Sequence, residues 1–230
     1  MNKKNLVIIG VSETSERVLW FCKHYNLFNV VGFAVDKEYI KEKTFHGYPV
    51  YDIKELEKYI DKDNDLIFVA ILWNHLNADR RMLFERLKTD GWHFANIISP
   101  KASVRGDVGE NVWIMDFVVV QEGAKVLNNV IIADNAFVGN CALIQNHCFC
   151  GPKSSVLGTV TLGEQSFVGA NATIFDKTQI GEKCVIGACT IVKRNVPSFT
   201  VIKTETNNNV IKTYPSDIIE TKLVSTNNVR

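Results

Sequence analysis

The sequence predicts an α/β domain followed by a parallel β-solenoid, and two periodicities along the chain carry that prediction. Over roughly the first hundred residues, short apolar runs alternate with segments of helical periodicity, which is the pattern of strands alternating with helices. From Val108 onward, an aliphatic residue or a cysteine stands at every sixth position. We therefore expect a Rossmann-like domain over 1–100, the solenoid over 101–203 and a polar tail over 204–230.

Composition places the chain among globular proteins. Its 230 residues are 46% apolar and 22% charged, which excludes disorder, and a net charge of +1 leaves no basic field for nucleic acid. The apolar run over 66–73 is too short to span a bilayer, and the run over 6–9 is too short for a secretion signal. We expect a cytoplasmic protein with no membrane span and no nucleic-acid partner, in which the six cysteines act as small apolar side chains.

The first domain begins with a strand, a turn and a helix. An apolar strand is predicted over 6–9, and Ser12 can cap a helix over about 13–25. The next strand, over 30–35, ends at Asp36, where a dinucleotide-binding fold carries the acid that contacts a ribose. The turn lacks the second and third glycines of G-x-G-x-x-G, so the pattern argues against an NAD-dependent enzyme.

The remainder of this domain continues the same alternation. In order, the pattern predicts a helix over 53–60, a strand over 66–71, a helix over 78–88 and a strand near 94–98. Ser99-Pro100 then closes the domain.

A six-residue repeat runs from Val108 to Val192. Fifteen consecutive hexads keep the aliphatic position, glycine follows it in seven of them, and the fifth position is small or β-branched. Six residues fit neither the 3.6 of a helix nor the alternation of a β-sandwich, but they fit a solenoid in which each hexad is one strand plus a corner. We expect five three-sided coils around a column of aliphatic side chains, each worth roughly 1.5–3 kcal/mol when buried.

Five segments of the chain together resemble one family. They are Gly-Val-Ser at 10–12, Val-Val-Gly-Phe-Ala-Val-Asp at 30–36, Phe-His-Gly-Tyr-Pro-Val at 45–50, Ile-Ser-Pro at 98–100, and the hexads ending in Val-Ile-Gly-Ala-Cys-Thr-Ile-Val-Lys-Arg-Asn-Val-Pro at 185–197. Over residues 4 to about 200 the chain resembles the bacterial left-handed β-helix sugar acyltransferases, which include N-acetyltransferases of nucleotide-linked amino sugars and sialic acid O-acetyltransferases. The resemblance implies a homotrimer that binds a nucleotide sugar in the α/β domain and acyl-coenzyme A between neighbouring β-helices.

The resemblance also implies which residues form the sites. The nucleotide-sugar site maps to Gly10, Ser12, Glu13, Asp36 and Lys37. Acetyl-coenzyme A, or another acyl-coenzyme A, maps to Ala170, Gly187, Ala188 and Arg194. Residues eighteen apart share a corner on successive coils, about 4.8 Å apart, so small residues at 170 and 188 leave a groove. Tight-turn chemistry is the alternative reason for small residues there.

The catalytic histidine of the family is missing from this chain. Asn140 stands at its position, and the family's second, less regular histidine falls at Phe149. A general base supplies about 10²–10⁴-fold of rate, so its loss favours an amine, which attacks through its lone pair, over a hydroxyl. The departing thiolate or a carboxylate such as Glu122, one coil from Asn140, then accepts the proton. His147 is a second catalytic candidate, with a surface or interface position as the alternative.

The sequence therefore predicts an acyl-CoA-dependent N-acyltransferase that acts on the amine of a nucleotide-linked deoxyamino sugar, in the synthesis of a surface glycan such as lipopolysaccharide. Two alternatives stay open: a sugar O-acetyltransferase, and a trimeric binding protein that has lost the chemistry. A zinc enzyme of the γ-carbonic-anhydrase type needs three histidine ligands, and the solenoid has one, so no metal site is expected.

Overall fold

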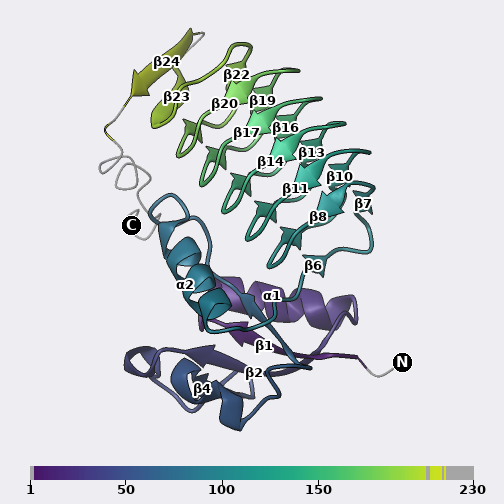
Figure 1. Ribbon diagram of the computed structural model, residues 1–230, viewed down its shortest axis with the longest axis vertical. Helices are drawn as coiled ribbons and strands as arrows, with labels where there is room; N and C mark the ends of the chain where they lie inside the picture. The colour runs from purple at the N-terminus through teal and green to yellow at the C-terminus, as the bar shows by residue number, and fades with distance from the viewer. Residues whose placement is uncertain (1–2, 206–207, 214, 216–230) are drawn as a thin grey trace. The chain divides into compact units, whose positions relative to one another are not determined.

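The computed structural model describes residues 3–205, 208–213 and 215, and its chain forms two compact units (Figure 1). The first unit comprises Met1–Leu72 and Met82–Ile97, and the second comprises Trp73–Arg81 and Ile98–Arg230. Within the described ranges, no helix is long and apolar enough to cross a membrane. The cytoplasmic location stays a prediction.

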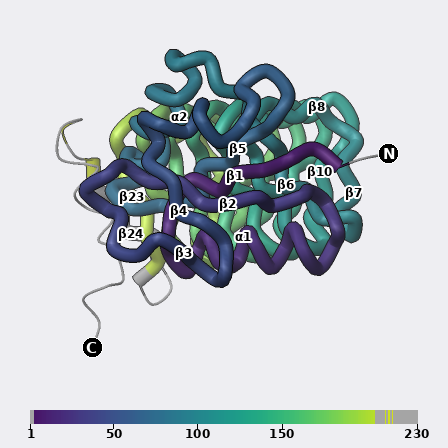
Figure 2. The backbone as a smooth tube through the Cα atoms, turned by 90° about the horizontal axis from the view of Figure 1, so that it is seen from below, coloured from purple at the N-terminus to yellow at the C-terminus, as the bar shows by residue number. Residues whose placement is uncertain are grey.

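The first unit is built on a parallel sheet whose strands have the order β4-β2-β1-β5, and Figure 2 shows these four strands side by side. The short strand β3 pairs antiparallel with β4 at the edge of this sheet. The strand bounds are β1 (Asn5–Ile9), β2 (Asn29–Val35), β3 (Thr44–Phe45), β4 (Tyr48–Asp52) and β5 (Leu66–Val69). The helices are α1 (Glu13–His24), η1 (Lys37–Tyr39), η2 (Ile53–Lys58) and α2 (Ala78–Thr89), where η marks a 3₁₀-helix.

The predicted strands at the start of the chain and both long helices are confirmed, whereas three details of the first domain differ. The segment predicted as a helix over 53–60 is the 3₁₀-helix η2. The strand predicted near 94–98 is divided: Phe94 forms only an isolated bridge, and β6 (Ile97–Ile98) pairs with the first coil of the solenoid. The hairpin of β3 and β4 was not predicted. It turns on His46 and Gly47, both with positive φ, which is the geometry of a tight two-residue hairpin turn.

The solenoid has three sheets of two-residue parallel strands, as its hexads predict, and the third sheet ends in two six-residue strands, which pair antiparallel with each other (Figure 1). The first contains β7 (Ser103–Val104), β10 (Val119–Val120), β13 (Phe137–Val138), β16 (Ser155–Val156), β19 (Thr173–Ile174) and β22 (Ile191–Val192). The second contains β8 (Asp107–Val108), β11 (Lys125–Val126), β14 (Leu143–Ile144), β17 (Thr161–Leu162) and β20 (Gln179–Ile180). The third contains β6, β9 (Trp113–Ile114), β12 (Ile131–Ile132), β15 (Phe149–Cys150), β18 (Phe167–Val168), β21 (Val185–Ile186), β23 (Thr200–Glu205) and β24 (Asn208–Thr213).

The predicted column of aliphatic side chains forms the core of the solenoid. From Ile114 to Val192, every sixth residue is at most 4% exposed, and Val108 packs partly buried against the same cluster. Each corner turns on one residue with positive φ, from Asn111 at 55° to Cys189 at 59°. Only one of these corner residues, Gly123, is a glycine, so the stacked coils stabilise a conformation that most side chains avoid. The stack of parallel sheets is consistent with a left-handed β-helix.

The C-terminal segment departs from the predicted polar tail. β23 pairs in parallel with β21, and β24 then pairs antiparallel with β23. The predicted tail over 204–230 therefore begins inside a hairpin, and its residues 206–207, 214 and 216–230 lie outside the described part of the chain.

Candidate functional site

The candidate residues of the solenoid fall on two of its three edges. The Asn140 edge consists of the corner residues Glu122, Asn140, Gly158, Asp176 and Arg194, and the Ala188 edge consists of Asp116, Asp134, Pro152, Ala170 and Ala188. Backbone hydrogen bonds hold successive corners together. The amide of Thr159, for example, donates to the carbonyl of Asn140 at 2.8 Å, and the amide of Lys177 donates to that of Gly158 at 2.9 Å. Residues eighteen apart in the sequence therefore stack directly on one another.

Asn140 is exposed at its corner and is directed toward the next coil. Its backbone amide donates to Oε1 of Gln121 at 3.0 Å, which fixes the corner below its side chain. Its Oδ1 atom lies 2.8 Å from the position that a Cβ atom on Gly158 would occupy. The missing side chain of Gly158 thus leaves space for the amide of Asn140.

Glu122 shares the Asn140 edge, as predicted, but its carboxylate is already engaged. Its Oε1 atom lies 2.6 Å from Nε of Arg105, and both side chains are largely exposed. The ion pair with Arg105 leaves this carboxylate less available to a bound substrate.

His147 lies inside the solenoid and not on its surface. It is 2% exposed, and its Nδ1 atom accepts a hydrogen bond from Nδ2 of Asn129 at 2.9 Å. Asn129 in turn accepts one from Asn111 at 2.8 Å, so the three side chains form a polar ladder over successive coils. Burial, together with the charges of Arg80 and Arg81, lowers the pKa of His147 to about 3. The imidazole is therefore neutral at pH 7 and belongs to a different edge from Asn140.

A short segment before and within the start of α2 covers this ladder. The guanidinium of Arg80, 1% exposed, donates to the carbonyl of Cys148 at 3.1 Å, and burial lowers the pKa of Arg80 to about 9. The ring of Trp73 packs on Phe149 and Phe167, with centroids 5.0 and 6.0 Å away. This contact was not predicted, because the periodicity of 78–88 indicates only a helix of the first domain. The sequence alone does not indicate that Arg80 is buried or that Trp73 packs on Phe149.

The upper part of the Ala188 edge is lined by small residues. The amide of Cys189 donates to the carbonyl of Ala170 at 2.8 Å, so 170 and 188 do stack on successive coils. Ala188 is exposed and Ala170 is half-buried. A Cβ atom on Gly169 would lie 2.8 Å from Cα of Ala188, whereas one on Gly187 would meet nothing closer than 3.1 Å. The strip that the sequence predicts for acyl-coenzyme A is therefore open, with close backbone packing beneath it.

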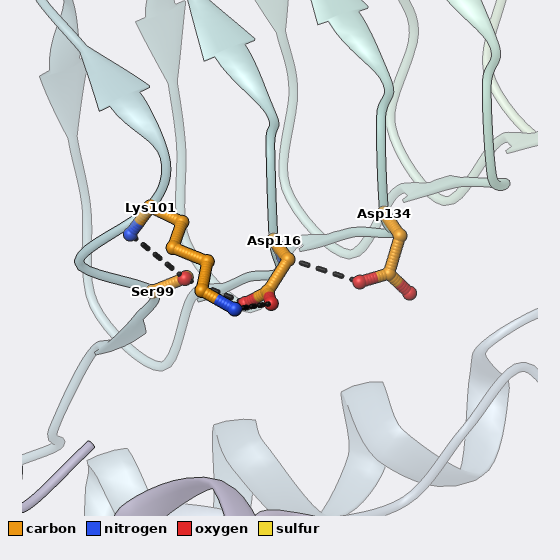
Figure 3. Close-up of polar contacts among 4 residues, drawn as sticks. All are labelled: Ser99, Lys101, Asp116 and Asp134. Carbon is orange, nitrogen blue, oxygen red and sulfur yellow. Dashed lines mark hydrogen bonds and ion pairs between the residues drawn. The ribbon is translucent and has the colours of Figure 1, made fainter. Parts of the chain in front are cut away.

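The lower part of the same edge is polar, as Figure 3 shows. Ser99 donates to Oδ1 of Asp116 at 2.6 Å, and Nζ of Lys101 lies 3.3 Å from Oδ2 of the same carboxylate. The backbone amide of Asp116 donates to Oδ1 of Asp134 at 3.2 Å. Aspartates at corners thus stabilise the turn of the preceding coil.

The predicted acyl-coenzyme A residues do not lie together in one protomer. Ala170, Gly187 and Ala188 belong to the Ala188 edge, whereas Arg194 lies on the Asn140 edge, three coils above Asn140. The two edges are different vertices of one three-sided coil. A single chain therefore does not bring Arg194 beside the small-residue strip.

The predicted nucleotide-sugar residues gather where β1 and β2 end. The amide of Gly10 donates to the carbonyl of Ala34 at 2.9 Å, so the ends of these parallel strands are adjacent. Gly10 has a φ of 127°, and a Cβ atom there would lie 2.8 Å from Oγ of Ser15, so glycine is required. Ser12 forms the N-cap of α1 with a capping box to Ser15, and Glu13 is exposed in the first turn.

Asp36 and Lys37 lie at the end of β2, where the 3₁₀-helix η1 begins. Both carboxylate oxygens of Asp36 accept hydrogen bonds from Nη2 of Arg86 at 2.9 Å. This ion pair forms part of a surface cavity of about 280 Å³, lined by Asp36, Ile53, Lys54, Glu57, Lys62, Arg86, Asp90 and Trp92. Arg86, which lines this cavity, was not predicted from the sequence.

The cysteines of the solenoid support the predicted interior positions. Cys148, Cys150 and Cys184 are buried, and burial raises the pKa of Cys150 to about 12. Cys141 and Cys189 are exposed at corners. Among the residues that the structure describes, no three His, Cys, Asp or Glu side chains are grouped as a metal site would require.

The chain is similar to one protein family in sequence and to several solved structures in fold. Residues 107–140 match the family described as bacterial transferase hexapeptide (six repeats). No curated protein sequence matches the chain. The solved structure of a variant of perosamine N-acetyltransferase from Caulobacter crescentus, in complex with CoA and GDP-perosamine, superposes with a TM-score of 0.79. It is 25% identical to this chain, and the match covers 91% of this chain and 97% of that one.

Two further solved structures show the same fold at lower identity. The acetyltransferase domain of PglB from Neisseria gonorrhoeae FA1090 is 21% identical, with a TM-score of 0.77 over 90% of this chain and 100% of that one. WeeI from Acinetobacter baumannii AYE is 16% identical, with a TM-score of 0.68 over 90% and 100%. The resemblance expected from the hexads is thereby confirmed: over nearly its whole length, this chain is similar to the left-handed β-helix sugar acyltransferases.

Proposed function

We propose that this protein is an acyl-CoA-dependent N-acyltransferase that moves an acetyl group to the amine of a nucleotide-linked deoxyamino sugar. The observation that carries the proposal is the similarity, over 91% of the chain, to an N-acetyltransferase bound to CoA and GDP-perosamine. Variants of that enzyme in which a histidine is replaced by asparagine or by alanine still bind both ligands. This supports a site at Asn140 that binds its substrates without an imidazole.

The chemistry at Asn140 favours an amine over a hydroxyl. A neutral amine attacks the thioester carbonyl through its lone pair and needs no prior deprotonation, whereas a hydroxyl needs a base during the attack. The amide oxygen of Asn140 can accept a hydrogen bond from the amine and so orient its lone pair, which is a contribution of proximity and alignment. The new C–N bond forms as the C–S bond breaks, and the thiolate of CoA leaves.

The position of the two edges supports a homotrimer with sites between protomers. The small residues at 170, 187 and 188 and the pair Asn140 and Arg194 lie at different vertices of one coil, so one chain cannot complete the site. A neighbouring copy can place its Ala188 edge beside the Asn140 edge of the first. In this arrangement Arg194 contacts the phosphates of acyl-CoA, since guanidinium groups bind phosphate in bidentate fashion.

The first unit is proposed as a Rossmann-like domain that binds the nucleotide sugar. Its strand order of 3-2-1-4 along the chain is that of a dinucleotide-binding half, in which ligands bind at the carboxyl ends of the strands. Gly10, Ser12 and Glu13 follow β1, and Asp36 and Lys37 follow β2, so these residues lie at that end. A diphosphate is expected at the N-terminus of α1, where backbone amides are available.

The two other residues predicted for proton transfer, His147 and Glu122, receive different roles in this proposal. His147 supports the interior of the coil, because its ring is buried and bonded to Asn129. Glu122 pairs with Arg105 and stabilises the corner below Asn140. We place the protein in surface glycan synthesis, where sugars of this kind are consumed.

The test is an assay of CoA release with a panel of nucleotide-linked amino sugars, each matched with its hydroxyl analogue. Acylation of the amines, confirmed by product mass, supports the proposal. Turnover of the hydroxyl analogues alone would identify an O-acetyltransferase. Binding of CoA and nucleotide sugar by calorimetry, with no turnover of either set, would identify a binding protein that has lost the chemistry.

A further inference from the structure

The Asn140 edge contains one position without a side chain, and two polar groups converge on it. Gly158 lies between Asn140, one coil below, and Asp176, one coil above. A Cβ atom on Gly158 would lie 2.8 Å from Oδ1 of Asn140 and 3.0 Å from Oδ1 of Asp176. The amide oxygen and the carboxylate oxygen therefore both lie against Gly158, close enough together for a single bound group to contact both.

The carboxylate of Asp176 is held in place but not neutralised. Its Oδ1 atom accepts a hydrogen bond from the backbone amide of Gly158 at 2.8 Å. The residue is exposed, and it forms no ion pair with any part of the chain that the structure describes. In this respect it differs from Glu122, whose carboxylate is 2.6 Å from Arg105. Of the two carboxylates on this edge, Asp176 is therefore the one that is open to a bound group.

A corner aspartate that bonds a backbone amide is not by itself a catalytic feature. Asp134 makes the same contact with the amide of Asp116, at 3.2 Å, on the Ala188 edge (Figure 3). What distinguishes Asp176 is the glycine beneath it and the amide side chain of Asn140 across the gap. Asp61 is the matched control, because its Oδ1 atom also accepts a hydrogen bond from a backbone amide, that of Asp63 at 3.0 Å, and it lies on neither edge of the solenoid.

We propose that Asp176 is the proton acceptor of the acyl transfer, an inference that rests on the proposed N-acyltransferase function. The amine nitrogen attacks the thioester carbonyl, the C–N bond forms, and the nitrogen becomes positively charged. One N–H proton passes to the carboxylate of Asp176 as the adduct collapses and the C–S bond breaks, with its electron pair leaving on sulfur. The proton then passes to the thiolate, which is released as CoA, and Asp176 is again ionised.

This assignment also explains why the substrate is an amine. A carboxylate readily accepts a proton from a cationic adduct nitrogen, but it is too weak a base to deprotonate a sugar hydroxyl. Asn140 and Asp176 together then do for an amine what a histidine would do for a hydroxyl. Because the carboxylate of Asp176 is a weak base, the site acylates an amine and not a hydroxyl.

The experiment compares Asp176→Asn with Asp61→Asn in the full-length protein. The amide oxygen of each variant keeps the bond to the backbone amide, so the local turn is retained. We expect Asp176→Asn to lower kcat by about 10²-fold, within the usual contribution of a general base, with KM for the amino sugar nearly unchanged. Asp61→Asn is expected to keep the wild-type kcat. Thermal unfolding and native mass of both variants confirm that the fold and assembly are intact.

Chemical rescue distinguishes proton transfer from a structural role. Asp176→Ala should recover activity when formate is added, because formate can take the place of the removed carboxylate and accept the proton, whereas Asp61→Ala should not respond. Wild-type activity in Asp176→Asn, or a loss in Asp176→Ala that formate leaves unchanged, would overturn the inference while the proposed function stands. Absence of amine acylation by the wild-type protein would instead overturn the proposed function and, with it, this inference.

Discussion

The buried imidazole of His147 makes the stability of the solenoid depend on pH, and His147→Asn should remove that dependence. Asparagine stands at the equivalent corners below it, at Asn111 and Asn129, and those two residues already form the first step of the polar ladder. The replacement keeps a polar group in the ladder and removes only the titratable ring. The difference between the two proteins therefore isolates one ionisation.

The size of the effect follows from the two pKa values of His147. Its ordinary value is 6.5, and burial lowers the pKa to about 3 in the folded chain. Below pH 6.5 the unfolded chain binds a proton that the folded chain does not, so stability falls as the pH falls, down to about pH 3. With 1.36 kcal/mol per pKa unit, the loss attributable to His147 is about 2 kcal/mol at pH 5 relative to pH 8.

The assay is urea unfolding of both proteins from pH 8 to pH 4.5, at one protein concentration because an oligomer's stability depends on it. The free energy of unfolding of the wild type should fall more steeply with decreasing pH than that of His147→Asn, with a difference near 2 kcal/mol at pH 5. His93→Asn, at an exposed histidine, is the control and should follow the wild type. Parallel curves for the wild type and His147→Asn would show that the imidazole is not buried neutral.

Three further predictions concern packing and the two sites. Gly169→Ala should destabilise the protein by about 1–3 kcal/mol, and clearly more than Gly187→Ala, because only the first added methyl collides with the backbone of the next coil; thermal unfolding measures this. Asn140→His should introduce a dependence of kcat on pH near 6.5, which a pH profile would detect or refute. Asp36→Asn should raise KM for the nucleotide sugar about tenfold at unchanged kcat, a loss of roughly 1.4 kcal/mol of binding free energy. Arg86→Gln should raise KM to a similar extent, because Arg86 holds the carboxylate of Asp36 in place.

The repeat made the solenoid predictable because one constraint recurs in every coil. An aliphatic residue at each sixth position from Val108 to Val192 has only one arrangement that buries all of them, and the structure has that arrangement. Corner stacking followed from the same count, so the positions of Asn140, Ala170 and Ala188 could be assigned in advance. The solenoid could be predicted because the aliphatic residue at every sixth position recurs for one structural reason, which is to fill the core.

The surroundings of His147 could not be predicted from that count. Its burial depends on a segment more than sixty residues earlier, in which Arg80 donates to the carbonyls of His147 and Cys148. No periodicity links the two segments. The positive φ values at 75 and 76 fall on His75 and Leu76, which are neither glycine nor asparagine, so the sequence does not indicate a turn there. The pair of Asp36 and Arg86 was missed for the same reason, since fifty residues separate its members.

The geometry of the coil explains how a catalytic group can change its type without a change of fold. Each corner side chain lies directly above and below others that are eighteen residues away, so a proton acceptor lost from one coil can be supplied from a neighbouring coil along the same edge. The requirement is that the two side chains can approach each other, and on the Asn140 edge Gly158, which has no side chain, allows this. The strength of the new base then limits the substrate, because a carboxylate serves a cationic nitrogen and fails with a hydroxyl. In such a solenoid, the nucleophile that reacts depends on the residues at three successive corners of one edge, which here are Asn140, Gly158 and Asp176.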